Sequence, residues 1–273
     1  EAALQNKHEV TLFNRGRNYA QEEIAGVEQI HGDRNSELDK LSGKNWDAVI
    51  DTCGYLPQTV RASAEFLADK LEQYVFISSG SVYADTSKPD YDETTRLATL
   101  DERQRAQIEK IDPRGELNGL TLGENYGALK ALCEAAAERA MPGRVLSVRA
   151  GMITGAFDWT DRFAYWVMRT ARGGTILAPG APENFVQLID ARDLSGWIVG
   201  MIERGESGGG SVEVRHRRTQ HGRAECEHQH PVRLPHYCEL PLIFSSRSCA
   251  RVNVGATISA SITCLRASSF CPA

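Results

Sequence analysis

Short runs of apolar and β-branched residues alternate, over most of the first 210 residues, with segments whose apolar residues recur every three or four positions. The strand-like runs are residues 10–14, 27–31, 47–52, 74–79 and 144–149, with a further short run at 211–214. Alternation of strand and helix patterns is typical of βαβ units around a mainly parallel sheet. We therefore expect an α/β fold with a doubly wound parallel sheet.

The segments between these runs carry recognisable helix ends. Pro57 suits the first turn of a helix, and apolar residues at helical spacing follow it. A second helix, rich in Ala and Leu, is predicted over residues 123–141 and ends before Pro142-Gly143. Residues 1–6 resemble the end of a helix that leads into the first strand. A sheet of this kind usually opens with a strand and a glycine-rich turn, and we expect this phosphate-binding loop to be missing.

The composition narrows the class of protein. Hydrophobic residues make up 41% of the 273 residues and charged residues 25%, which excludes wholesale disorder, collagen and coiled coils. There is no run of about 18 apolar residues to span a bilayer, and the first nine residues are too charged for a secretory signal. We expect a soluble, cytoplasmic protein with no membrane partner.

The last 65 residues differ from the rest of the chain. Residues 1–208 carry 23 Lys and Arg against 32 Asp and Glu, a net charge of −9, whereas residues 209–273 carry 8 against 4, a net charge of +4. The same tail holds five of the seven cysteines and five of the seven histidines, and it lacks a sustained helix or strand period. We expect residues 211–273 to be an atypical, poorly ordered tail.

A metal site in the tail is one alternative. Cys226, His228, His230, His236 and Cys238 are residue types that bind zinc, but their spacing matches no familiar zinc module. We therefore expect no metal site. The acidic body also disfavours a specific nucleic-acid footprint.

Tyr126 and Lys130 lie four positions apart on the second predicted helix, so their side chains share one face. A free tyrosine has a pKa of about 10, so its use as an acid or base near neutral pH requires a shift of roughly 3 units, about 4 kcal/mol. A neighbouring ammonium favours the phenolate and is the simplest source of that shift. By itself such a spacing is more often a surface pair than a catalytic one.

A serine-rich run, residues 76–83, ends a predicted strand upstream of Tyr126. In open α/β sheets ligands bind outside the carboxyl ends of the strands. We therefore expect the hydroxyls of this run to lie where a ligand would bind. The alternative is a turn that merely caps the strand.

Two later segments complete a pattern. Residues 149–155 (Arg-Ala-Gly-Met-Ile-Thr-Gly) follow a predicted strand, and residues 185–194 end in Asp-Ala-Arg-Asp-Leu. Together with the serine run and the Tyr-x-x-x-Lys pair, they resemble the extended short-chain dehydrogenase/reductases, the NAD-dependent epimerase/dehydratase family, over about residues 1–206. The family pattern has Pro where Ala150 stands here.

The resemblance implies a Rossmann-like fold and roles for matching residues. Tyr126 would be the general acid/base, and Lys130 its electrostatic partner and a ligand of the nicotinamide ribose. Ser79 matches the family's catalytic hydroxyl, which polarises the substrate oxygen, with Ser81 as the second choice. Arg149 and Gly151 would lie next to the nicotinamide. The implied domains are an NAD(P)-binding Rossmann-like domain over 1–150 without its first strand and glycine-rich loop, and a small, incomplete substrate lobe over 151–210 with elements that return to it.

The residues after the strand at 10–14 bear on the choice of cofactor. An NAD enzyme usually places a carboxylate there for the ribose 2′-hydroxyl, whereas this chain has Asn14, Arg15 and Arg17 around Gly16. An arginine can accept a 2′-phosphate instead, so we favour NADP over NAD. The alternative is a solvated basic turn.

Further cofactor contacts follow from the resemblance. Asp33 matches an adenine-contacting residue of the family, and Cys53, Gly54 and Ser78 match positions that line the cofactor. Cys53 is expected to be a small buried hydrophobe rather than a nucleophile.

We expect an oxidoreductase or isomerase that moves a hydride between nicotinamide and a carbonyl or nucleotide-sugar substrate. The alternatives are a non-catalytic, dinucleotide-sensing or RNA-associated member of the same fold, and an inactive fragment. The resemblance also implies a homodimer that pairs through the helix bearing Tyr126.

Overall fold

The computed structural model describes most of the chain. The described residues are 1–16, 24–86, 91–115, 117–156, 158, 161–177, 186–206, 210–214, 217–218, 224–225 and 261–267. They form two compact units. The first unit comprises Glu1–Gly151, Arg192–Val214 and Thr257–Ala273, and the second comprises Met152–Ala191 and Arg215–Ala256.

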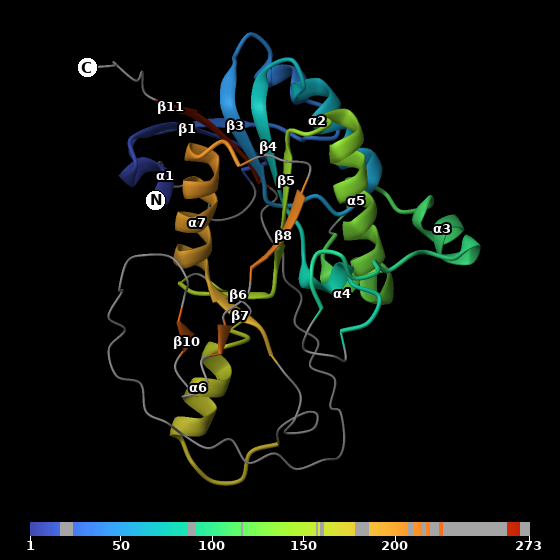
Figure 1. Ribbon diagram of the computed structural model, residues 1–273, viewed down its shortest axis with the longest axis vertical. Coiled ribbons are helices and arrows are strands. Elements are labelled where there is room, and N and C mark those ends of the chain that lie inside the picture. Colours follow the sequence, from blue (N-terminus) through green and yellow to red (C-terminus); the bar gives the residue numbers. More distant parts are fainter. Residues whose placement is uncertain are drawn as a thin grey trace. The chain divides into compact units, whose positions relative to one another are not determined.

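A seven-stranded sheet forms the centre of the first unit (Figure 1). Its strands, in spatial order, are β2 (Val27–His31), β1 (His8–Asn14), β11 (Ser261–Ala267), β3 (Trp46–Asp51), β4 (Leu71–Ile77), β5 (Val145–Ala150) and β8 (Gly210–Val214). Every neighbouring pair is parallel except the two that involve β11, which runs antiparallel to both β1 and β3. The fold is therefore α/β with a mostly parallel, Rossmann-like sheet, as the sequence predicts.

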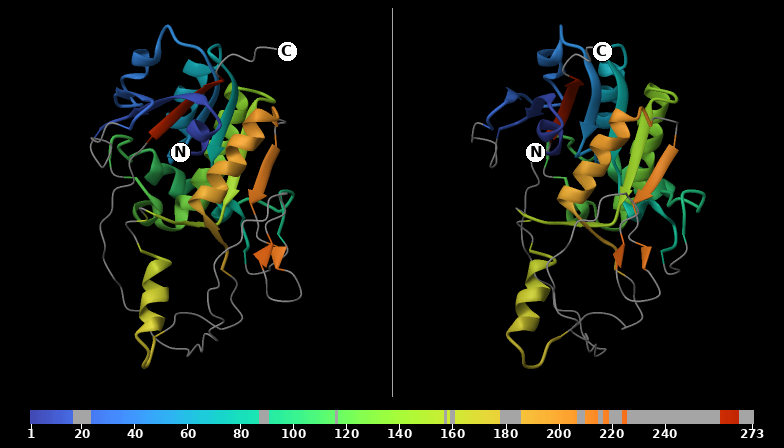
Figure 2. Two further views of the ribbon diagram at one scale, coloured as in Figure 1. Left: turned by 90° about the vertical axis from the view of Figure 1, so that its left-hand side faces the viewer. Right: turned by 60° about the vertical axis from the view of Figure 1, so that its left-hand side comes forward.

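Helices cover both faces of this sheet. α2 (Pro57–Leu67) and α5 (Tyr126–Ala140) pack together on one face, and α1 (Ala2–Gln5) and α7 (Ala191–Glu203) lie on the other (Figure 2). The side-chain amide of Asn6 donates to the carboxylate of Glu203 at 2.9 Å, which joins the ends of α1 and α7. Shorter elements lie between the main ones: η2 (Leu38–Leu41), η3 (Gly80–Val82), α3 (Glu102–Ile108), α4 (Gly119–Leu122) and η4 (Gly123–Asn125).

The main core lies between the sheet and the α2–α5 layer. It is built from apolar side chains of the central strands and the two helices: Phe13, Val49, Val60, Ala64, Leu67, Tyr74, Phe76, Cys133, Ala137, Met141 and Cys264. Burial of this helix face accounts for the position of α5, because helices in proteins are stabilised mainly by packing. A second cluster, which includes Leu56, Leu122 and Leu129, lies near the start of α5.

The second unit contains short elements. β6 (Met152–Thr154) and β7 (Leu188–Asp190) form a parallel pair, β9 (Arg217–Arg218) and β10 (Ala224–Glu225) form an antiparallel pair, and α6 (Ala164–Ala171) exposes apolar side chains such as Tyr165 and Met168. Among the described residues no helix is both long and apolar enough to cross a membrane.

Strand β11 was not predicted from the sequence, and it falls in the segment expected to be poorly ordered. Cys264 and Leu265, two consecutive residues of β11, are 0% and 1% exposed. Successive side chains of a strand point to opposite faces of the sheet, so both faces of β11 are buried here. A strand buried on both faces shows no alternation of apolar and polar residues, and the period of two is therefore absent.

The burial of β11 leads to a stability prediction. Leu265→Ala should lower the free energy of unfolding by about 2–5 kcal/mol, because it leaves a cavity in the sheet core. The same change at Leu177, which is 60% exposed, should alter it by less than about 0.5 kcal/mol. Urea denaturation of both variants measures the difference, and equal midpoints would place β11 outside the core.

Candidate active site

Several residues predicted from the sequence follow strands at one edge of the sheet. Asn14 is the last residue of β1, Ser78 and Ser79 follow β4, and Gly151 follows β5. Because β1, β3, β4 and β5 run in the same direction, their carboxyl ends lie at a common edge, where open α/β sheets bind ligands.

Helix α5 approaches this edge through a glycine. A Cβ atom on Gly127 would lie 2.0 Å from the carbonyl oxygen of Ser81, a distance that no side chain tolerates. Glycine is therefore required for the helix backbone to touch the backbone of η3. Tyr126 precedes this contact and Ser79, the N-cap of η3, lies two residues before Ser81. Tyr126 and Ser79 are 47 positions apart in the sequence, and the structure brings the segments that carry them together.

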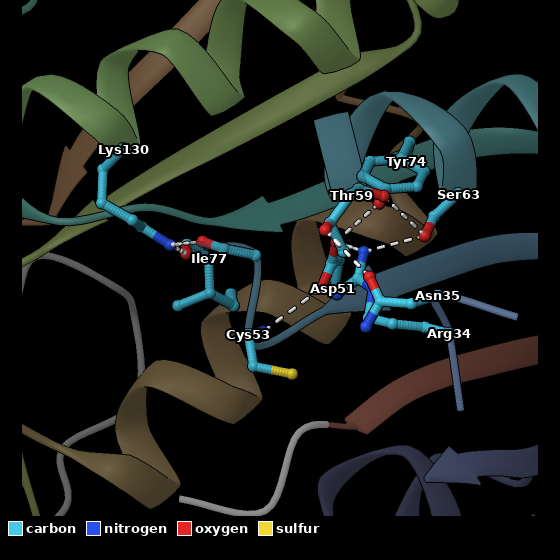
Figure 3. Close-up of polar contacts among 10 residues, drawn as sticks. Arg34, Asn35, Asp51, Cys53, Thr59, Ser63, Tyr74, Ile77 and Lys130 are labelled. Atoms are coloured by element: carbon cyan, nitrogen blue, oxygen red, sulfur yellow. Dashed lines mark hydrogen bonds and ion pairs between the residues drawn. The ribbon is translucent and has the colours of Figure 1, made fainter. Parts of the chain in front are cut away.

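Lys130 reaches the turn after β3 and the end of β4 (Figure 3). Its Nζ donates to the carbonyl oxygen of Gly54 at 2.9 Å and to that of Ile77 at 2.6 Å, and it lies 4.1 Å from the centre of the Phe76 ring. The side chain is 2% exposed. Burial lowers the pKa of Lys130 below the usual lysine value, because desolvation disfavours the ammonium.

Tyr55 lies beside Tyr126 and was not among the site residues predicted from the sequence. Its ring centre lies 6.3 Å from that of Tyr126 and 5.6 Å from Nζ of Lys130. Burial raises the pKa of Tyr55, and the neighbouring Tyr126 adds to the effect. Tyr55 therefore remains a neutral phenol beside Tyr126. Its signal in the sequence was only its place after a predicted strand, which many structural residues share.

The two serines differ in their surroundings. Ser79 Oγ accepts a hydrogen bond from the amide of Ser81 at 3.1 Å. A hydroxyl that accepts in this way keeps its own proton for donation. Ser78 is 5% exposed, and its Oγ is buried with no hydrogen-bond partner in the described structure. Such an orphaned atom at a strand end is compatible with a polar ligand.

Arg149 is held by protein groups rather than directed to the open edge. Its Nε and Nη2 donate to the two carboxylate oxygens of Glu134 at 3.1 and 2.7 Å, and Nη1 donates to the Tyr83 hydroxyl at 3.2 Å. Burial opposes the charge, but the hydrogen bonds and charge of Glu134 raise the pKa of Arg149 above its usual value. This bidentate pair fixes α5 to β5. The geometry supports a positioning role for Arg149.

The basic turn after β1 is partly described. Asn14 is 3% exposed, and its Oδ1 accepts from the amide of Gly16 at 2.8 Å. Arg15 reaches the carbonyl oxygen of Arg114 with Nη1 at 3.5 Å. Arg17 lies outside the described residues, as do the tail cysteines and histidines weighed as zinc ligands. Arg15 is thus the described cation of the turn that could meet a 2′-phosphate.

The loop after β2 presents the predicted adenine contact. Asp33 is half-buried, and its Oδ1 accepts from the amide and the side chain of Asn35 at 2.9 and 3.0 Å. Asn35 also donates to the carbonyl oxygen of Pro113 at 3.2 Å. The carboxylate is therefore fixed in orientation, beside the segment that also meets Arg15.

The backbone groups after β3 form hydrogen bonds within the protein. The amide of Cys53 donates to Asp51 Oδ1 at 3.2 Å, and the carbonyl of Gly54 accepts from Lys130. A Cβ at Gly54 would lie 2.3 Å from Val60 Cγ2, so packing alone requires the glycine. Burial raises the pKa of the Cys53 thiol, which agrees with an inert, buried cysteine.

The described residues fit a dinucleotide at its two ends but not at its centre. Asp33 and Arg15 suit the adenosine end, and Tyr126, Lys130 and the orphaned Ser78 hydroxyl suit the nicotinamide ribose end. Antiparallel β11 lies between β1 and β3 and pairs its first residue with Asn14. The described residues therefore include no glycine-rich turn after a strand at this place in the sheet. Within the same residues, no group of three or more His, Cys, Asp or Glu side chains could hold a metal ion.

Comparison with solved structures supports the fold. An enzyme of Bordetella bronchiseptica in complex with NAD and UDP aligns with a TM-score of 0.53 at 13% identity, over 78% of this chain and 66% of that one. A UDP-N-acetylglucosamine 4-epimerase from Methanobrevibacter ruminantium aligns with a TM-score of 0.52 at 14% identity, over 76% and 69%. An epimerase from Methanothermobacter thermautotrophicus aligns with a TM-score of 0.50 at 15% identity, over 76% and 64%.

These likenesses confirm, at the level of fold, the resemblance to epimerases and dehydratases drawn from the sequence. The chain spans less than two thirds of the Methanothermobacter epimerase. Comparison with protein-family models gives no match, and comparison with curated proteins gives none either.

The contact between α5 and η3 can be tested with two glycines. Gly127→Ala should lower the free energy of unfolding by about 1–3 kcal/mol, because the backbones must separate. A Cβ at Gly196, within α7, would come within 4 Å of no described atom outside its own stretch of helix. Gly196→Ala should therefore raise the free energy of unfolding by about 0.4–1 kcal/mol. Denaturant titration measures both, and a stabilising Gly127→Ala would contradict the close approach.

Proposed function

We propose that this chain is an NAD(P)-dependent oxidoreductase or epimerase that moves a hydride between nicotinamide and a carbonyl or nucleotide-sugar substrate, with Tyr126 as general acid/base. The observation that carries the proposal is the packing of α5 against the end of β4. It brings the segment of Tyr126 and Lys130 to the segment of Ser79, at the edge of the sheet where ligands bind.

The chain's residues would handle the proton and the oxygen. In the oxidative direction, the Tyr126 phenolate takes the proton of a substrate hydroxyl, while Ser79 donates a hydrogen bond to the same oxygen. Lys130 stabilises the phenolate by its charge. Within the described part of the chain its ammonium donates to Gly54 and Ile77, which uses two of its three N–H groups. The bound nicotinamide would supply the acceptor for the hydride.

Arg149 and Tyr55 would act through Tyr126 rather than on substrate. The pair of Arg149 with Glu134 fixes α5 to β5, and the neutral Tyr55 ring lies beside Tyr126. Fixed neighbours hold the reacting phenol within the narrow range of positions that proton transfer requires.

The aligned structures bear on the class of substrate. Two of the aligned enzymes were solved with UDP or a UDP-sugar bound, which supports a nucleotide sugar. A reductase acting on a ketone or enone uses the same proton-transfer residues. For the cofactor, Arg15 beside the end of β1 supports NADP.

The acid/base role can be tested by removing one hydroxyl. Tyr126→Phe should lower turnover of UDP-N-acetylglucosamine or UDP-glucose by about 10²–10⁴-fold, the usual contribution of a general acid/base. Affinity for NAD or NADP should change little, because the ring stays in place. Product chromatography and cofactor fluorescence measure the two effects. The control is Tyr91→Phe, which removes a hydroxyl from a ring packed on Tyr83; full turnover by Tyr126→Phe would refute the role.

The cofactor preference depends on Arg15. Arg15→Asp should raise the Kd for NADPH by about tenfold or more, since a charge-assisted hydrogen bond to the 2′-phosphate is lost, and should affect NADH less. Arg61→Asp on the exposed face of α2 is the charge-matched control. Fluorescence titration with both cofactors measures the ratio, and an unchanged ratio would assign Arg15 to a solvated turn.

A second candidate is binding of a dinucleotide without turnover. The antiparallel direction of β11 favours this candidate. A parallel strand between β1 and β3 would end at the ligand edge and lead into a phosphate-binding turn, whereas β11 begins at that edge. The same titrations separate the two candidates: cofactor affinity with no product from a nucleotide-sugar and carbonyl panel supports binding alone.

A further inference from the structure

A buried ion pair joins the loop after β2 to the end of β3 (Figure 3). Arg34 follows β2, and Asp51 is the last residue of β3. Nη1 and Nη2 of Arg34 donate to Oδ1 and Oδ2 of Asp51, each at 2.7 Å. The two side chains are 8% and 0% exposed. The pair is thus bidentate and shielded from water, the geometry in which an arginine fixes a carboxylate most firmly.

Two further elements complete this network. Arg34 Nη2 donates to Ser63 Oγ of α2 at 2.9 Å, and the Tyr74 hydroxyl of β4 donates to Asp51 Oδ2 at 2.7 Å. With the amide of Cys53, the Asp51 carboxylate receives four hydrogen bonds. Its two oxygens can accept about that number. Protein groups therefore use the full hydrogen-bonding capacity of the Asp51 carboxylate, so Asp51 does not bind a dinucleotide directly.

On one side, the network holds the loop that carries Asp33. Arg34 is the next residue in the chain, and Asn35 binds the Asp33 carboxylate. The Thr59 hydroxyl of α2 in turn donates to Asn35 Oδ1 at 3.0 Å. The predicted adenine contact is therefore anchored to β3 through Arg34 and to α2 through Asn35.

On the other side, the network reaches Lys130. The amide of Cys53 binds Asp51, and the carbonyl of the next residue, Gly54, accepts from Lys130 Nζ. A hydrogen-bonded path therefore joins the loop after β2 to the helix that carries the proposed acid/base. Both ends of the proposed cofactor site depend on the position of Asp51.

The pair is a weak device for stability alone. A buried ion pair loses its hydration, and apolar residues of similar volume often replace one with no loss of stability. Here Arg34 Nε is also buried with no hydrogen-bond partner in the described structure, a further cost. What apolar residues could not reproduce is the set of directed bonds to two loops.

We propose that the Arg34–Asp51 pair is a positioning element that holds the Asp33 loop and the Cys53–Gly54 turn in register for an adenine dinucleotide. The inference rests on the proposed function for the identity of the ligand. Neither side chain needs to touch that ligand.

The test compares variants of the full chain that each lose a different interaction. Asp51→Asn removes the charge and keeps the shape, and Tyr74→Phe removes one hydrogen bond to Asp51. Gln73→Met is the control, because Gln73 neighbours Tyr74 on β4, is 5% exposed and donates to the carbonyl oxygen of Glu206 instead. ADP-ribose is the probe, with its Kd measured by calorimetry, and thermal melting records the stability of each variant.

Asp51→Asn should raise the Kd for ADP-ribose by about tenfold or more and Tyr74→Phe by about threefold, whereas Gln73→Met should leave it within about twofold. The comparison is made at temperatures equally far below each melting point, so a merely structural role would affect all three alike. Equal Kd values for Tyr74→Phe and Gln73→Met would overturn the proposal, even if Asp51→Asn fails to fold.

Amide hydrogen exchange separates this inference from the proposed function. Amides of residues 32–35 and 53–55 should exchange faster in Tyr74→Phe than in Gln73→Met, whether or not a ligand binds. If the unaltered chain binds no ADP-ribose, the proposed function fails, and the exchange rates alone decide whether the pair holds the two loops. Unchanged exchange at both loops would contradict the positioning role.

Discussion

The ammonium of Lys130 joins helix α5 to the ends of two strands, and the arrangement of the candidate site depends on that contact. Its bonds to the carbonyl oxygens of Gly54 and Ile77 fix the first turns of α5 against β3 and β4. Desolvation disfavours a buried ammonium, and carbonyl dipoles together with the ring of Phe76 offset that penalty. A charge held in this way can also stabilise a phenolate one helical turn away.

Two buried arginines also hold elements of the ligand edge together through charged hydrogen bonds. Arg149 with Glu134 joins β5 to α5, and Arg34 with Asp51 joins the loop after β2 to β3. Each pair is bidentate, and a planar guanidinium fixes both distance and orientation. Removal of one partner would leave an uncompensated buried charge, so each pair holds the two elements it joins in one arrangement. The edge is thus organised by charges that the solvent does not reach.

Strand β11 shows how the tertiary structure can use a segment that its own sequence leaves undefined. Between β1 and β3, both faces of a strand are covered, so Cys264 and Leu265 are buried although they are neighbours. The period-two signal of a half-exposed strand is absent from such a position. Its antiparallel direction also has no local cause, since pairing depends on strands that lie more than 200 positions earlier in the chain.

The parallel strands β1 to β5 and the helices α2 and α5 could be predicted from the sequence, because apolar periodicity is a local property. Ser79, Tyr126 and Lys130 were named from the Tyr-x-x-x-Lys spacing and from the resemblance, and their roles stay predictions. The direction of Arg149 into Glu134, the place of Tyr55 beside Tyr126 and the role of Asp51 could not be predicted. Those contacts join residues from different elements, and only packing decides which side chains meet. The sequence determined which groups the edge of the sheet carries, and the tertiary structure decided which face outward and which hold the others in place.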